Sequence, residues 1–160
     1  MTQNLNELFH ELLKDVYYAE KQLVNALPKM AENSDSDELK QAFSDHHKET
    51  QEHVKRLEQV FAEIDEKPTG KQCEAMDGLI AEGQEVMSEA DRGPVLDAGL
   101  IASAQAVEHY EIARYGTLCA WAKQLGLEKA EETLRATLDE ERNADALLTE
   151  IAEADINQAA

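Results

Sequence analysis

Residues 100–118 read LIASAQAVEHYEIARYGTL. Apolar side chains recur in this stretch at intervals of three or four positions, at Leu100, Ala104 and Val107 and again at Tyr115 and Leu118, with a step of eight positions between the two sets. This is the spacing of the buried face of an α-helix. Glu108 and Glu111 fall on the same face, halfway along it. Because a carboxylate in an apolar core needs a compensating partner, the stretch predicts a long buried helix and a polar group inside it.

Three further segments show the same periodicity, and the expected helices span about residues 4–31, 36–64, 94–125 and 128–155. Asn4 and Glu7 have the spacing of a capping box at the start of the first helix. Pro28 is expected to bend or end the last turn of that helix. The connection before the third long helix contains Gly78 and Gly83 and is expected to form one or two short helices.

A ferritin-like bundle has this connectivity: two tightly joined helices, then a long crossover, then two more tightly joined helices. The sequence therefore predicts an all-α fold, a ferritin-like (rubrerythrin-like) antiparallel four-helix bundle with a long helical crossover at about residues 65–94. Residues 1–160 are expected to form a single domain. A plain up-down bundle with an inserted hairpin is the alternative.

Each of the other apolar stripes also meets polar residues near its middle. These are Glu20 in the first segment, His46, Glu49, Thr50 and His53 in the second, and Glu141 and Asp145 in the fourth. The helix midpoints fall near positions 18, 50, 110 and 142, and one glutamate lies within about two residues, or roughly 3 Å at helical rise, of each midpoint. Because antiparallel helices of equal length align at their centres, these side chains are predicted to meet in one layer.

Like charges that meet in a dry interior must be neutralised, and carboxylate oxygen with imidazole suits iron or manganese. We therefore expect two iron or manganese ions, with a donor set of one histidine and five or six carboxylates. The candidate ligands are Glu20, His46, Glu49, Glu108, Glu111 and Glu141. His53 and Asp145 are further candidates, as ligands or as side chains that orient one, and Tyr17 or Tyr115 could hydrogen-bond a ligand carboxylate. The alternative is a hydrated or partly protonated polar layer without metal.

Composition excludes several classes of function. Fifteen Lys and Arg against 34 Asp and Glu give a formal net charge of −19. This charge disfavours binding to nucleic acid or to an anionic membrane surface, and no apolar run is long enough for a membrane helix. Without a visible export signal, Cys73 and Cys119 are expected to be reduced thiols in the cytoplasm.

Five motifs give the chain a resemblance to a known family. They are DVYYAEKQ at residues 15–22, His46 with Glu49-Thr50, CEAMDGL at 73–79, VEHYEIA at 107–113 with Tyr115, and Glu140-Glu141 with Asp145. On these motifs the chain resembles the YciE/YciF family of ferritin-like bacterial stress proteins over nearly its whole length. The resemblance implies a rubrerythrin-like bundle, a homodimer and a dimetal site at the matching acids, but no substrate.

Two functions remain open from the sequence. The first is a dimetal stress-response oxidoreductase that reacts with oxygen or peroxide. The chain has no Cys-x-x-Cys pair, so peroxidase turnover would need an external reductant. The second is a non-enzymatic, homodimeric helical scaffold with a vacant or structural metal site.

Overall fold

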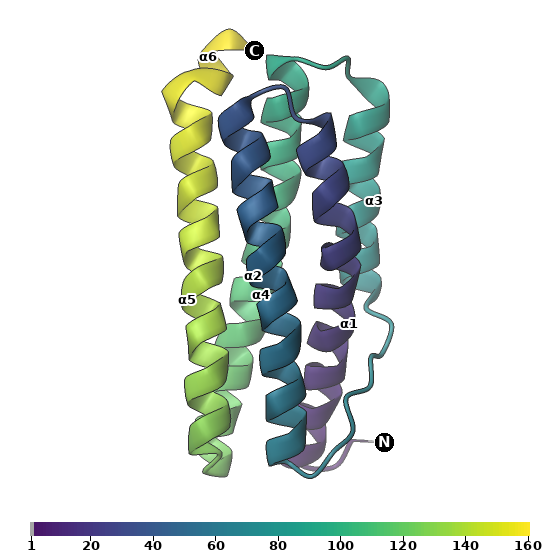
Figure 1. Ribbon diagram of the computed structural model, residues 1–160. Coiled ribbons are helices and arrows are strands. Elements are labelled where there is room, and N and C mark those ends of the chain that lie inside the picture. The colour runs from purple at the N-terminus through teal and green to yellow at the C-terminus, as the bar shows by residue number, and fades with distance from the viewer. Residues whose placement is uncertain (1) are drawn as a thin grey trace.

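The computed structural model describes residues 2–160, which form a bundle of long helices (Figure 1). The elements are α1 (Leu5–Asn33), α2 (Asp37–Glu63), α3 (Glu74–Glu89), α4 (Pro94–Leu125), α5 (Glu128–Ile151), a π-helical turn η1 (Ala152–Ile156) and α6 (Asn157–Ala159). Within this described range there is no strand, so the all-α prediction is confirmed. None of the helices described is long and apolar enough to cross a membrane.

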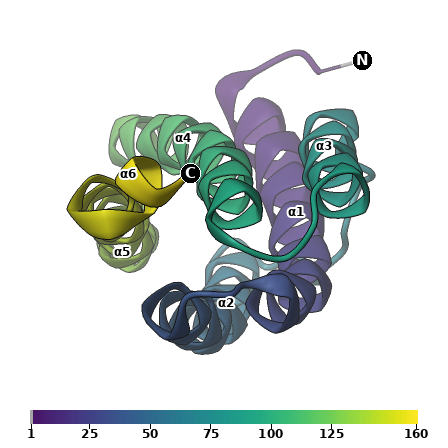
Figure 2. The same cartoon turned by 90° about the horizontal axis from the view of Figure 1, so that it is seen from above.

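Helices α1, α2, α4 and α5 form the bundle, and the crossover lies outside it (Figure 2). Both α1 and α5 pack against α2 and against α4, while α3 covers α1 and α4. The chain rises in α1, descends in α2, returns along the bundle through α3, descends in α4 and rises in α5 (Figure 1). Since residues 64–93 span the length of the bundle, α2 and α4 run in the same direction. This topology confirms the four-helix bundle with a long crossover and excludes the plain up-down alternative.

Side-chain and backbone caps mark the predicted helix ends. At the start of α1, Asn4 Oδ1 accepts the backbone N–H of Glu7 at 3.0 Å, and the Asn4 amide donates to the Glu7 carboxylate at 2.9 Å. Ser36 Oγ accepts the backbone N–H of Leu39 at 3.3 Å at the start of α2. Gly126 closes α4 with φ of 73°, in the left-handed region that glycine tolerates.

The structure decides two points that the sequence left open. Helix α1 does not end at Pro28 but continues to Asn33, because buried Leu27 and Met30 hold the last turns against the core. The crossover contains one helix, α3, that runs through both of its glycines. A Cβ at Gly83 would lie 3.6 Å from Ser103 Cβ of α4, an ordinary van der Waals distance, so the packing there does not require glycine.

The buried apolar side chains form two clusters, one towards each end of the bundle. One contains, among others, Leu27, Phe43, Leu100 and Leu148, and the other contains Leu13, Leu57, Leu118 and Leu134. In each bundle helix, the polar residues predicted above lie between a member of one cluster and a member of the other. The structure therefore has an apolar core divided by a polar level near its middle.

Candidate metal centre

Six buried ionisable side chains converge between the two apolar clusters. They are Glu20 from α1, His46 and His53 from α2, Glu108 and Glu111 from α4, and Glu141 from α5. All six lie on the face that their helix turns to the core, so the burial of the neighbouring apolar residues also buries these groups. We call this set the polar layer.

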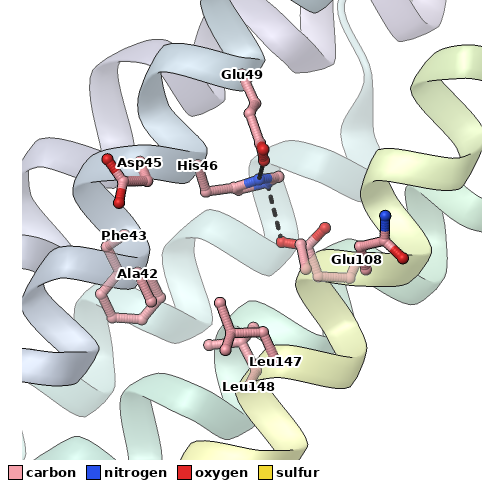
Figure 3. Close-up of a pocket in the computed structure, with 10 residues that line it drawn as sticks. Ala42, Phe43, Asp45, His46, Glu49, Glu108, Leu147 and Leu148 are labelled. Carbon is pink, nitrogen blue, oxygen red and sulfur yellow. Dashed lines mark hydrogen bonds and ion pairs between the residues drawn. The ribbon is translucent and has the colours of Figure 1, made fainter.

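The larger group within the polar layer consists of His46, Glu108, Glu111 and Glu141. One potential ligand atom from each residue lies within 4.8 Å of those of the others. His46 Nε2 is 3.2 Å from Glu108 Oε1 and 3.5 Å from Glu141 Oε2. Figure 3 shows His46 reaching from α2 towards Glu108. Three carboxylates and one imidazole are a donor set that suits a divalent transition-metal cation.

A second group, Glu20, His53 and Glu141, meets the same criterion. His53 Nδ1 is 3.0 Å from Glu141 Oε1 and 3.4 Å from Glu20 Oε1. Glu141 belongs to both groups: its Oε1 faces His53 and its Oε2 faces His46. A carboxylate with its two oxygens divided in this way can bridge two cations.

Several polar atoms of this layer have no hydrogen-bond partner. Within residues 2–160, all the buried side-chain atoms without a partner belong to the layer: Glu20 Oε2, His53 Nδ1, Glu108 Oε2 and both carboxylate oxygens of Glu111 and Glu141. His53 Nδ1 is near Glu141 Oε1 but is not aligned for a hydrogen bond. Because an unpartnered buried carboxylate oxygen destabilises a fold, the protein atoms alone do not complete this arrangement.

Each histidine of the polar layer directs its second ring nitrogen to a carboxylate outside the layer. His46 Nδ1 is 3.2 Å from Glu49 Oε2, and His53 Nε2 is 2.8 Å from Glu140 Oε2. Arg56 donates two hydrogen bonds to Glu140, at 2.6 and 2.9 Å. Such partners fix the ring orientation and hold the N–H outward, which leaves the inward nitrogen free to bind a cation.

Of the two tyrosines considered from the sequence, only Tyr115 contacts the polar layer. Its hydroxyl donates to Glu20 Oε1 at 2.5 Å, and both side chains are fully buried. Burial and then the nearby carboxylates hold the pKa of Tyr115 well above its ordinary value, so it remains a donor. The hydroxyl of Tyr17 instead donates to Glu58 at 2.9 Å, away from the layer.

Burial and neighbouring charges shift the pKa values of Glu20, Glu111, Glu141 and both histidines towards proton uptake. Burial raises the pKa of Glu20 and Glu111 and raises that of Glu141 to about 7. Burial opposes the charged form of both histidines, but adjacent carboxylates outweigh it. Glu108 thus raises the pKa of His46 well above its ordinary value, and Glu20 and Glu141 raise that of His53 to about 11. Cation binding would displace these protons.

The structure brings together six of the eight site residues predicted from the sequence, namely the members of the polar layer. Glu49 and Asp145 lie outside it. The Glu49 side chain is 48% exposed and is at the edge of the buried face of α2. Asp145 contacts Gln105 at 3.0 Å and His109 at 3.1 Å on the outer side of α4 and α5.

Arg56 was not singled out from the sequence, and Glu140 was noted only within the Glu140-Glu141 family motif and not as a separate site residue. Their signal in the sequence is weak: Arg56 lies three positions after His53 on one helix face, and Glu140 directly precedes Glu141. Only the packing of α2 against α5 shows that Arg56 of α2 forms an ion pair with Glu140 of α5.

The donor set of the polar layer fits two divalent cations. Four carboxylates carry the charge that two such cations neutralise, and two neutral imidazoles complete the set. This differs from the expected one histidine and five or six carboxylates. It equals, in number and type, the four glutamates and two histidines of carboxylate-bridged dimetal bundles. Here, however, α2 supplies both histidines and α4 supplies two glutamates.

Comparison with known proteins gives a family and several close relatives. The family described as "Domain of unknown function (DUF892)" matches residues 4–160. Protein YciF of Escherichia coli (strain K12) is 45% identical over 159 residues, which cover 99% of this chain and 96% of YciF.

Solved structures agree with this match. The crystal structure of the E. coli stress protein YciF superposes with a TM-score of 0.94 at 44% identity, over 98% of this chain and 99% of that one. YcfI from Rhodopseudomonas palustris, a protein with a suggested structural role, superposes with a TM-score of 0.90 at 47% identity. The match covers 92% of this chain and 94% of YcfI. A protein from Xanthomonas campestris pv. campestris superposes with a TM-score of 0.73 at 24% identity, over 94% of this chain and 92% of that one. This match shows a likeness of fold alone.

Proposed function

This chain belongs to the DUF892 family, and from that premise we propose that it is a ferritin-like stress-response protein that holds two iron or manganese ions and reacts with dioxygen or hydrogen peroxide. One observation carries the proposal: Glu141 belongs to both groups of potential ligands, and neither of its carboxylate oxygens has a hydrogen-bond partner. Membership of a family with a stress protein among its relatives supports the biological context.

In this proposal, the six side chains of the polar layer would hold the two cations, and Glu141 would be shared by both groups of ligands. Glu49 and Glu140 hold the histidine rings in place, and Tyr115 orients Glu20. The apolar clusters above and below shield the layer from bulk water at the two ends of the bundle. Bound iron or manganese supplies the electrons and the position at which an oxygen species reacts.

An external electron donor belongs to the same proposal. The two cysteines, Cys73 and Cys119, are free, buried and far apart in the sequence, so they are not placed as a dithiol reductant. Free thiols suit a reducing compartment, and we propose a cytoplasmic homodimer, as the family resemblance implies. Light scattering of the purified protein and fractionation of the host cells test these two points.

A metal titration tests the dimetal site. Anaerobic addition of ferrous iron to the purified protein should saturate at about two ions per chain, and admission of air should then produce a near-ultraviolet absorption band. Glu141→Gln should lose both ions, because both groups share this residue. Glu132→Gln, at an exposed position of the same helix, should bind iron normally. Failure of the unaltered protein to bind iron or manganese would refute the proposal.

A structural role is the second candidate, and two observations favour it. YcfI, 47% identical to this chain, has a suggested structural role. In addition, His46 and His53 already lie within ion-pair distance of the buried carboxylates, so protonated histidines offset part of the charge without metal. Elemental analysis of protein isolated from its own host separates the two functions: a scaffold would carry neither iron nor manganese in stoichiometric amount.

A further inference from the structure

A cavity of about 120 Å³ lies between α2 and α5 and leads to the polar layer (Figure 3). Ala42 and Phe43 line it from α2, and Ala144 and Leu147 line it from α5. Leu147 is 43% exposed, so the cavity opens to solvent at this side chain. The cavity therefore connects solvent to the interior at mid-height of the bundle.

The inner end of the cavity is formed by His46 and Glu108, whose side chains are 3.2 Å apart (Figure 3). Glu108 is almost fully buried, and its Oε2 has no hydrogen-bond partner. Both residues belong to the larger ligand group of the polar layer. A molecule that enters from the side of Leu147 thus arrives at the cation position bounded by this group.

The size and lining of the cavity select its occupant. A volume of about 120 Å³ accepts a few water-sized groups but not a metabolite with a ring system. The walls are mostly apolar, while Asp45 and Glu49 at the sides and Glu108 at the end carry negative charge. Because these acids repel anions and the mostly apolar walls disfavour a hydrated cation, the cavity favours a small uncharged molecule.

Ala144 creates part of this space. It lies three residues after Glu141 on α5, where the glutamate-x-x-histidine pattern of dimetal bundles has a histidine. A methyl group in place of an imidazole leaves room beside His46 and Glu108.

We propose that this cavity is the entrance and binding pocket for a small uncharged dioxygen species, O₂ or H₂O₂, at the cation held by His46, Glu108, Glu111 and Glu141. The inference rests on the proposed dimetal function, and it assigns Ala144 and Leu147 as the residues that control access.

Nitric oxide is a suitable probe, because it is small, uncharged and binds ferrous iron with a visible absorption change. Its association rate with the ferrous-loaded protein is measured by rapid mixing. Ala144→Leu, which fills the inner part of the cavity, should slow association by about tenfold, equivalent to about 1.4 kcal/mol. Ala136→Leu, the same change at an exposed position of α5, should leave the rate unchanged.

Iron content is measured first, so that the two proposals fail separately. Absence of iron from the unaltered protein refutes the dimetal function, whereas normal loading with an unchanged rate in Ala144→Leu overturns the entrance. Leu147→Trp narrows the solvent-facing opening of the cavity without reaching the ligands. If Ala144→Leu does not load iron, the association rate in Leu147→Trp tests the entrance instead. Parallel mixing experiments with O₂ and with H₂O₂ show which species the cavity admits. If the reaction of the narrowed variant is as fast as that of the unaltered protein with both species, the proposal is contradicted.

Discussion

Both histidines of the polar layer are held at two points, and this has a chemical consequence. His46 and His53 each present one nitrogen to the buried carboxylates and the other to an outer one, Glu49 or Glu140. A neutral histidine has one N–H, and the outer carboxylate is its acceptor. The lone pair then lies on the inward nitrogen, as metal ligation requires.

The first prediction separates an orienting carboxylate from a ligand at the position of Glu49. Glu49→Gln keeps the size of the side chain but weakens its hold on His46, so we expect about two ions per chain still to bind, with affinity reduced about 10–100-fold. Glu108→Gln removes a buried ligand candidate and should lose an ion. Calorimetric titration with manganese measures both effects. Glu63→Gln, at the exposed end of α2, is the control.

The opposite result is equally informative. If Glu49→Gln loses an ion outright, Glu49 turns inward on metal binding and is a ligand, as the sequence predicted. Glu140→Gln provides the parallel case for His53, with the difference that Arg56 is then left without its carboxylate partner.

At the scale of elements, the turn between α1 and α2 is fastened to α4 by one carboxylate. Asp97 is buried, and its two oxygens accept the backbone N–H groups of Asp35 and Ser36, each at 2.8 Å. Arg92 adds a hydrogen bond to the Ser34 carbonyl at 2.8 Å. This contact joins the two helix pairs at one end of the bundle.

The second prediction concerns this joint. Asp97→Ala leaves two backbone donors without an acceptor and should lower the free energy of unfolding by about 1–3 kcal/mol, measured by urea denaturation. Asp91→Ala, at an exposed position just before α4, should change it by less than about 0.5 kcal/mol. Equal stabilities of the two variants would show that water replaces the Asp97 contacts.

The third prediction tests the contact between α1 and α2 through its pH dependence. Burial and the hydrogen bond to Glu58 raise the pKa of Tyr17 from 10.0 to about 12. A raised pKa means that Tyr17 contributes stability below pH 10, which is lost as the pH rises to about 12. Tyr17→Phe should therefore weaken the decline in stability over this range, as followed by chemical denaturation at a series of pH values. A decline as steep as in the unaltered protein would assign it to other groups.

Hydrophobic periodicity and helix caps made the helices predictable from the sequence, but the side-chain contacts between helices were not predictable from it. Period and capping residues placed α1, α2, α4 and α5 to within a few residues. The buried face of α2 shows the limit: His46 and Glu49 are one turn apart, yet one is buried and the other half exposed. A rotation of α2 by a few tens of degrees, set by its packing against α1 and α5, decides between them. The partnership of Glu140 with His53 depends on that same packing.

At the scale of the whole molecule, the polar layer opposes folding unless it is neutralised. The chain carries a formal net charge of −19, and four of its carboxylates are buried at one level of the core. Replacement of buried charged groups by apolar ones of similar volume often stabilises a protein. The retention of these groups thus has a cost in stability, which cation binding would offset by mass action.

The fourth prediction follows from this opposition. Glu111 is fully buried, neither of its oxygens has a hydrogen-bond partner, and burial and then the nearby Glu20, Glu141 and Glu108 raise its pKa well above the ordinary value. Glu111→Leu should therefore stabilise the metal-free protein by about 1–3 kcal/mol, measured by denaturation with a chelator present. With manganese at about 100 times its dissociation constant, the unaltered protein should gain about 2.7 kcal/mol for each ion bound, and the variant should gain much less.

The order of stability should thus reverse or converge when metal is added, and each protein should show one cooperative transition if residues 1–160 form a single domain. The corresponding change at exposed Glu132 alters neither the metal-free stability nor the gain. If Glu111→Leu destabilises the metal-free protein, Glu111 acts as a hydrogen-bonded core residue. If the variant gains as much from manganese as the unaltered protein, Glu111 is not a ligand. Only the combination of higher metal-free stability with a lost response to metal identifies a residue kept for cation binding at the expense of the fold.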